Sequence, residues 1–207
     1  MSLHIINHPL IDDKMTRIRN KETGPKEFRE LVEEVSTIIC YEATKDAQTS
    51  KITIETPIQE MQGIEIATKY AIVPILRAGL GMVAGVQKLL VRSKIGHIGL
   101  YRDPETLKPI EYYTKLPTDV EDRVVILVDP MVATGGSVDE SVRILKDAGV
   151  KKIKLFSLVT CPESISYLED KHPDLEIYTA AHDEQLNDHG YIVPGLGDAG
   201  DRLYGTL

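Results

Sequence analysis

One stretch constrains the fold more than any other: an apolar run that ends in an acidic residue and a loop of small residues. Residues 124–128 are all apolar and four of them are β-branched, which is typical of a strand buried on both faces of a parallel sheet. Asp129 follows at once, and Pro130 keeps Asp129 extended and ends the ladder of hydrogen bonds. We therefore expect Asp129 just outside the carboxyl edge of a parallel sheet.

The small residues that follow predict an anion site at the start of a helix. Residues 134–137 (Thr-Gly-Gly-Ser) offer hydroxyls and open backbone N–H groups, and a helix with one apolar face runs from there to Gly149. A helix N-terminus favours phosphate. Asp129 cannot bind a phosphate, so sugar hydroxyls or a metal ion are its expected partners. A ligand with both ribose and phosphate satisfies the whole pattern, whereas the alternative is an ordinary strand-to-helix connection.

These residues carry a resemblance to a known family. The segment 129–137, Asp-Pro-Met-Val-Ala-Thr-Gly-Gly-Ser, resembles the phosphoribosyl-pyrophosphate (PRPP) loop of type I phosphoribosyltransferases. Its sequence is similar to that of the uracil phosphoribosyltransferase branch in particular. Pro130 stands where many relatives carry a second acid. That departure is typical of the uracil branch and leaves one carboxylate. The resemblance covers essentially the whole chain.

Hydrophobic patterning predicts a single α/β domain over residues 1–207, with a doubly wound, mainly parallel five-stranded sheet. Strands are expected at 70–76, 95–101, 123–128, 153–159 and 175–179, and helices within 12–22 and over 25–45, 80–91, 138–148 and 162–170. Residues 50–68 indicate a small β excursion. Lys14, Arg17 and Arg19 make the first helix basic, and we interpret them as solvated charges.

Two arginines directly follow predicted strands. Arg77, with Ala78 and Gly79 after it, ends the strand at 70–76, and Arg102 ends the next one. A surface ion pair is the alternative for Arg77, but its expected place beside the acidic loop favours anion binding. The resemblance implies that both arginines hold the pyrophosphate of PRPP and that a non-prolyl cis peptide lies next to Arg77.

An extended β-arm is predicted over 101–117. Ile110, Tyr112, Thr114 and Leu116 alternate with Glu111, Tyr113 and Lys115, and Lys108 and Pro109 lie near the turn. A strand pair with one apolar face and few charges needs a partner, so contact between subunits is its expected use.

The C-terminal segment, residues 182–207, has little periodicity and much Gly, Asp and Pro, and so long an irregular stretch is usually functional. Within it, 191–202 resembles the uracil-recognition segment of the family, so 182–207 is the expected base-binding hood. Gly195 to Gly200 match the letters G-x-G-x-x-G but lack a βαβ context, and the spacing of His182, Asp183 and His189 fits no familiar metal site.

The resemblance implies transfer of phosphoribose from PRPP to uracil, giving UMP and pyrophosphate in pyrimidine salvage. Mg²⁺ is expected to enter with PRPP, with no direct protein ligand except possible help from Asp198. The residues implied for catalysis are Asp129, Asp198 and Arg102. Those implied for PRPP binding are Arg77, Arg102, Asp129, Pro130, Met131, Val132, Ala133, Thr134, Gly135, Gly136, Ser137 and Asp198. Those implied for uracil binding are Tyr191, Ile192, Gly197, Asp198 and Ala199.

The composition limits which binding partners and which cellular location are expected for the protein. The net charge of −8 argues against nucleic acid or an acidic membrane as a partner, and no apolar run is long enough to cross a bilayer. Two cysteines without a C-x-x-C pattern fit a reduced cytoplasm. The resemblance implies a homodimer or a higher homo-oligomer. It also implies activation by GTP in some bacterial relatives, although the sequence reveals no GTP site.

Two other functions stay open at this point. One is a phosphoribosyltransferase for another base, such as a purine or orotate. The other is a non-enzymatic regulator that senses PRPP or UMP, since some members of the superfamily bind RNA. The acidic charge and the lack of a basic stripe disfavour this second function.

Overall fold

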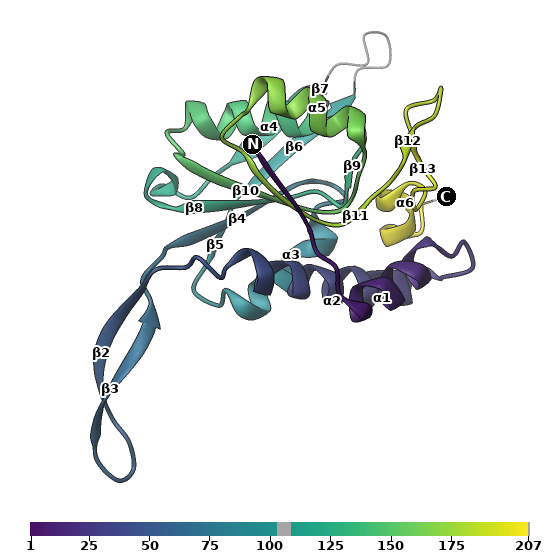
Figure 1. The fold of residues 1–207 in the computed structure, drawn as a ribbon. Coiled ribbons are helices and arrows are strands. Elements are labelled where there is room, and N and C mark those ends of the chain that lie inside the picture. The colour runs from purple at the N-terminus through teal and green to yellow at the C-terminus, as the bar shows by residue number, and fades with distance from the viewer. Residues whose placement is uncertain (103–108, 207) are drawn as a thin grey trace.

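A mainly parallel sheet with helices on both faces organises the chain in the computed structural model, which describes residues 1–102 and 109–206 (Figure 1). The sheet order is β1-β11-β10-β8-β4-β6-β7, and every neighbouring pair is parallel except β6 and β7. Its strands are β1 (Ser2–Ile5), β4 (Tyr70–Leu76), β6 (His97–Arg102), β7 (Pro109–Lys115), β8 (Val124–Val128), β10 (Lys152–Thr160) and β11 (Glu176–His182), with β5 (Lys94–Ile95) beside β4 and β9 (Met131–Val132) beside β10. Two separate hairpins are formed by β2 (Thr49–Glu55) with β3 (Glu60–Ile66) and by β12 (Gln185–Leu186) with β13 (Ile192–Val193).

Helices cover the two faces of the sheet and enclose two hydrophobic cores. They are α1 (Pro9–Arg19), α2 (Pro25–Ala43), α3 (Leu80–Leu89), α4 (Gly136–Asp147), α5 (Pro162–Lys171) and α6 (Ala199–Tyr204), with a short 3₁₀ turn at Val120–Asp122. In Figure 1, α4 and α5 lie on one face and α1, α2 and α3 on the other. Ile126 and Val128 of β8 point into the core beneath α2, while Val125 and Leu127 point into the core beneath α4. The run at 124–128 is apolar throughout because β8 is buried on both faces.

The five predicted strands are confirmed, and proline marks where several helices begin. Pro9, Pro25 and Pro162 each occupy the first turn of a helix, where a missing N–H costs nothing and the fixed φ suits the helix. The first helix begins at Pro9, somewhat earlier than expected. Among the described residues, the sheet also has four strands beyond the predicted five. β1 pairs with β11 and β7 pairs with β6 at the opposite edges, and the short strands β5 and β9 pair with β4 and β10.

The projecting arm differs from the prediction. In the predicted arm over 101–117, the described residues form the end of β6 and the strand β7, which are paired at the edge of the main sheet. Residues 103–108 lie outside the described part. The hairpin that projects is β2–β3 (Figure 1), and it leaves Ile58 and Ile64 92% and 73% exposed. Strand alternation predicts a hairpin at both places, but it does not reveal which hairpin joins the sheet.

The C-terminal hood (residues 182–207) contains more regular structure than expected. It begins at the end of β11, forms the β12–β13 hairpin and closes with α6, while Leu207 lies outside the described residues. Among residues 1–102 and 109–206, no helix is both long enough and apolar enough to cross a membrane.

Candidate active site

The sheet order creates a crevice between two loops that both carry predicted site residues. β4 and β8 are hydrogen-bonded neighbours, although β6 follows β4 in the chain and lies on its other side. At such a reversal the connections leave in opposite directions, and ligands of doubly wound sheets bind outside the carboxyl ends of the strands there. The loop after β4 begins with Arg77 and the loop after β8 begins with Asp129, so the predicted arginine and the predicted acid lie at one switch point.

The loop after β8 forms a small cradle at the start of α4. The backbone N–H of Asp129 donates to the carbonyl of Phe156 at 3.1 Å, and β9 then pairs with β10. Gly135 adopts a φ of 81° and α4 begins with the next residue, so the free N–H groups of the helix face the loop. The predicted residues of 129–137 gather around a cavity of about 60 Å³, lined by Asp129, Met131, Val132, Ala133, Thr134, Gly135, Ser137 and Val138.

Asp129 is placed as expected, and its environment changes its acidity. Burial raises the pKa of its carboxyl to about 7, and the one hydrogen bond from the backbone N–H of Met131, at 3.3 Å, offsets this only in part. Asp129 nevertheless lines a cavity, through which part of its surface stays accessible. A desolvated carboxylate with free acceptor capacity is well suited to hydroxyl donors from a ligand.

Arg77 spans the crevice from the other loop. The peptide bond between Leu76 and Arg77 is cis, which confirms the prediction. The Arg77 guanidinium lies 3.3 Å from the carboxylate of Asp201, and the hydroxyl of Tyr204 donates to the Arg77 carbonyl at 3.0 Å. Arg77 therefore makes an ion pair, which was the alternative to anion binding in the sequence analysis. Its partner, Asp201, belongs to the hood. Its side chain remains 57% exposed.

The hood closes the crevice and lines a larger cavity. This cavity, of about 310 Å³, is formed by Ala78, Asp129, Met131, Ala133, His189, Gly190, Tyr191, Gly197, Asp198, Ala199 and Gly200. Four of the five predicted base-binding residues are among them. The fifth, Ile192, belongs to β13 and is buried in the core. Asp198 caps α6, where its side chain accepts the N–H of Asp201 at 2.9 Å.

The residues predicted for the site that remain are Arg102, Pro130 and Gly136. The side chain of Arg102, which ends β6, is not part of what the structure describes. Pro130 lies in the loop and Gly136 is the first residue of α4, and neither lines the two cavities described above. His189 and Gly190 do line the 310 Å³ cavity. Sequence reasoning missed them because they precede the segment that carries the resemblance.

Arg19 was interpreted as a solvated charge, and this was wrong. Its guanidinium makes a bidentate ion pair with Asp183 at 2.6 and 2.7 Å, 164 residues away in the chain. Arg17 does remain a surface residue, with its side chain 56% exposed. Helical periodicity places both arginines on the helix but does not identify a partner so remote in sequence.

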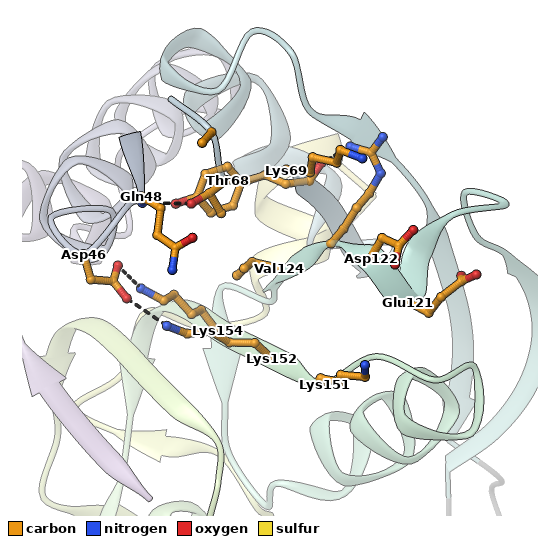
Figure 2. Close-up of a pocket in the computed structure, with 13 residues that line it drawn as sticks. Asp46, Gln48, Thr68, Lys69, Glu121, Asp122, Val124, Lys151, Lys152 and Lys154 are labelled. Atoms are coloured by element: carbon orange, nitrogen blue, oxygen red, sulfur yellow. Dashed lines mark hydrogen bonds and ion pairs between the residues drawn. The ribbon is translucent and has the colours of Figure 1, made fainter. Parts of the chain in front are cut away.

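A second cavity lies at the opposite edge of the sheet, away from the predicted site. Its volume is about 650 Å³, and it is lined by the amino-terminal ends of β4, β8 and β10 (Figure 2). Lys152 and Lys154 both point at Asp46, with Nζ–O distances of 2.8 and 2.6 Å. Although larger, this cavity contains none of the predicted site residues and two of its lysines are already paired, so the crevice at the carboxyl edge is the candidate active site.

The fold is that of the phosphoribosyltransferases. A solved hypoxanthine-guanine phosphoribosyltransferase from Bacillus anthracis aligns with 77% of this chain and 79% of its own, with a TM-score of 0.52 and 13% identity. At that identity the likeness shows the fold alone. A solved protein from Aquifex aeolicus is far more similar, with a TM-score of 0.93 and 35% identity over 98% of this chain and 97% of that chain.

The sequence comparisons identify the branch. The family model for uracil phosphoribosyltransferase matches residues 5–206. Uracil phosphoribosyltransferases of Anoxybacillus flavithermus and Brevibacillus brevis are 58% and 59% identical to this chain, each over 99% of it and 98% of the relative. The chain therefore belongs to the uracil phosphoribosyltransferase family.

Proposed function

We propose that the protein transfers the phosphoribosyl group of PRPP to uracil, giving UMP and pyrophosphate. The observation that carries this proposal is the cavity of about 310 Å³ in which the Asp129 loop faces the hood, in a chain of the uracil phosphoribosyltransferase family. The Asp129 loop lines both this cavity and the cavity of about 60 Å³ at the start of α4, so it offers an acid and a helix N-terminus for a ribose phosphate. The hood side of the larger cavity offers glycine-rich backbone for a base. This is the arrangement that the transfer requires.

PRPP is proposed to lie across the carboxyl edge of the sheet. Residues 134–137 hold its 5′-phosphate at the N-terminus of α4, where orphan N–H groups and the helix dipole favour an anion. Asp129 accepts the ribose hydroxyls. Arg77 and Arg102 hold the pyrophosphate, and their positive charge stabilises the leaving group as the bond to the anomeric carbon breaks.

Mg²⁺ is proposed to arrive bound to PRPP. Among the described residues, no group of three or more His, Cys, Asp or Glu side chains could hold a metal ion. Asp129 and Asp198 nonetheless line the same cavity, and oxygen donors of this kind suit Mg²⁺. Asp198 would contact the ion from the hood side, and the ion would neutralise charge on the pyrophosphate.

Uracil is proposed to be recognised largely by backbone groups of the hood, at Ile192, Gly197 and Ala199, with Tyr191 packed near the base. Uracil presents alternating acceptors and N–H donors, which main-chain groups can match. Cytosine reverses a donor and an acceptor, so a fixed backbone rejects it by leaving polar groups unpaired. Positioning of the two substrates is then the main source of rate, and no side chain is assigned as a general base.

The cradle depends on Gly135. A Cβ there would meet Tyr167 Cδ1 at 2.9 Å at a φ of +81°, whereas a Cβ at Gly136 would have only ordinary contacts at 3.8 Å. We expect Gly135→Ala to lower the free energy of unfolding by about 1–3 kcal/mol and to raise KM for PRPP at least tenfold. Thermal melts and initial rates measure both, with Gly136→Ala as the matched control for stability. Equal stability of the two variants would contradict this role.

Asp198 permits a nearly isosteric test. Asn caps a helix as well as Asp does, so Asp198→Asn keeps the bond from the Asp201 N–H and removes only the charge that faces the cavity. We expect kcat to fall about 10²-fold, a loss typical of one electrostatic contact, with Tm changed by less than about 2 °C. Near-normal turnover would remove Asp198 from the site.

Release of pyrophosphate on mixing the protein with PRPP, Mg²⁺ and uracil tests the whole proposal. Release with hypoxanthine, guanine or orotate but not with uracil would point to another base. Binding of PRPP or UMP without turnover of any base would point to a regulator instead.

Three further expectations belong to this proposal. We propose a homodimer or higher homo-oligomer, supported by the exposed apolar side chains of the β2–β3 arm. We propose GTP as an activator on the strength of the family resemblance alone. A cytoplasmic location is supported by two cysteines, Cys40 and Cys161, that are buried and unpaired.

A further inference from the structure

We propose that Arg19 and Asp183 are positioning residues for base recognition, because together they fix the backbone of the hood at Gly195, close to the groups that contact the base. This inference rests on the proposed function, since it concerns how uracil is held. Neither residue belongs to the described lining of the 310 Å³ cavity, so any effect on uracil must pass through the backbone they hold.

The contacts form a closed triangle. The two terminal nitrogens of Arg19 donate to the two carboxylate oxygens of Asp183 at 2.6 and 2.7 Å. One of these nitrogens also donates to the Gly195 carbonyl at 2.7 Å, and the Gly195 N–H donates to Asp183 at 2.8 Å. Both backbone polar groups of Gly195 are therefore satisfied by this one ion pair. The Asp183 side chain is only 6% exposed, where charge-assisted bonds are strong.

The backbone around Gly195 forms a tight turn between two buried residues, Ile192 and Leu196. The Val193–Pro194 peptide is cis, and Gly195 and Gly197 have φ values of 63° and 82°. β13 ends at Val193, so no sheet ladder continues into this turn. A Cβ at Gly195 would lie 2.2 Å from the Ile192 carbonyl, which shows how tightly the chain doubles back here.

Because uracil is proposed to be recognised by backbone groups, the position of the hood backbone determines how well the base is bound. A side chain that contacts a ligand can change rotamer, but a main-chain N–H or carbonyl moves only with its loop. Productive sites need their groups held within about 0.5 Å, and a planar, bidentate arginine provides such geometric precision better than a lysine does. The structure gives Gly195 this support two residues before Gly197, which lines the cavity.

Arg202 provides a second, different attachment. It donates to the carbonyls of Ile18 and Leu196 at 2.5 and 2.7 Å, and its guanidinium lies 4.4 Å from the centre of the Phe28 ring. These contacts fasten the hood to the C-terminal end of α1, where cations are favourable. With one end of the turn fastened in this way, Arg19 and Asp183 are left to set the orientation of the Gly195 peptide groups.

Arg19→Lys tests the proposal because it retains a cation beside the buried Asp183 but cannot make the bidentate ion pair. We expect KM for uracil to rise at least tenfold, KM for PRPP to change less than twofold, and the preference for uracil over cytosine to fall. Arg17→Lys is the matched control. It alters an arginine of the same helix that makes only a 3.6 Å surface contact with Asp13, and it should leave all three quantities unchanged. Equal changes in both KM values, or no change in either, would overturn the proposal.

A second measurement does not depend on activity. We expect Asp183→Asn to speed hydrogen exchange at the amides of residues 195–197 at least fivefold in the protein without substrates, with Arg17→Lys again unchanged. If Arg19→Lys does not fold, Asp183→Asn takes over the kinetic test with the same outcomes. Unaltered exchange in Asp183→Asn would contradict the positioning role. Failure of the wild-type protein to use uracil would remove the proposed function while leaving the exchange result to stand alone.

Discussion

Asp129→Asn is expected to lower kcat/KM for PRPP by about 10²–10³-fold and, at the same time, to make the substrate-free protein more stable. The loss of activity follows from the proposed contact with the ribose hydroxyls, because a preorganised charged acceptor in a dry site contributes strongly to transition-state binding. The gain in stability follows from burial. The wild-type carboxyl is desolvated so strongly that its pKa rises to about 7, so holding it ionised at alkaline pH is costly.

The pH dependence of stability has a definite sign. Because the folded-state pKa of Asp129 lies above its unfolded value, the folded protein retains a proton that the unfolded chain has already released. The wild type therefore loses stability as pH rises from about 4 to about 7, and the loss is complete above that range. At about 1.4 kcal/mol per pKa unit, discounted for access to water, the penalty is about 2–4 kcal/mol. Asp129→Asn lacks it, so its Tm should exceed that of the wild type by about 4–12 °C at pH 8 and by less at pH 5.

Kinetics should show the same ionisation. The pH profile of kcat/KM reports the ionisations of the free enzyme and the free substrate, so the wild-type value for PRPP should fall as pH drops through about 7. The phosphates of PRPP titrate in this region as well, and the Asn variant reveals that contribution because it should retain only the substrate's inflection. A variant that is less stable than wild type at pH 8, or a profile identical in the two proteins, would refute the assignment.

Much of this fold follows from local sequence because individual residues have only one favourable arrangement. Residues 124–128 alternate between two hydrophobic cores, so an unbroken apolar run was the correct signal for a doubly covered strand. Prolines at the first turns of α1, α2 and α5 mark real helix starts. The two loops with Arg77 and Asp129 meet because parallel strands end at one edge, which the order of strands and helices already implies.

The features that escaped prediction depend on pairing between remote residues. Arg19 and Asp183 are 164 positions apart, and helical periodicity does not identify a partner so remote in the sequence. The same reason explains the arm, because β2–β3 and β6–β7 both alternate and only one of them joins the main sheet. For the hood, a long irregular stretch and the family resemblance both pointed to a segment that lines the 310 Å³ cavity.

Gly79→Ala is expected to destabilise the protein by more than about 3 kcal/mol, the range of severe overpacking. A Cβ at Gly79 would lie 2.4 Å from the Val128 carbonyl and 2.7 Å from two backbone atoms of Ile75. These atoms belong to the paired strands β4 and β8, so no flexible side chain can move aside, and the strands must separate where the switch point opens.

This clash would reach the site as well as the core. Gly79 lies two residues after Arg77 and its N–H donates to the Ile75 carbonyl at 2.9 Å, so a shift of this turn displaces Arg77 relative to Asp129. We expect low soluble yield, or a Tm at least about 6 °C below that of the wild type, with KM for PRPP raised in any protein recovered. Gly24→Ala is the matched control, because a Cβ there meets nothing within 4 Å. Normal stability of Gly79→Ala would mean that β4 and β8 do not approach so closely. The described position of Arg77 relative to Asp129 would then be wrong.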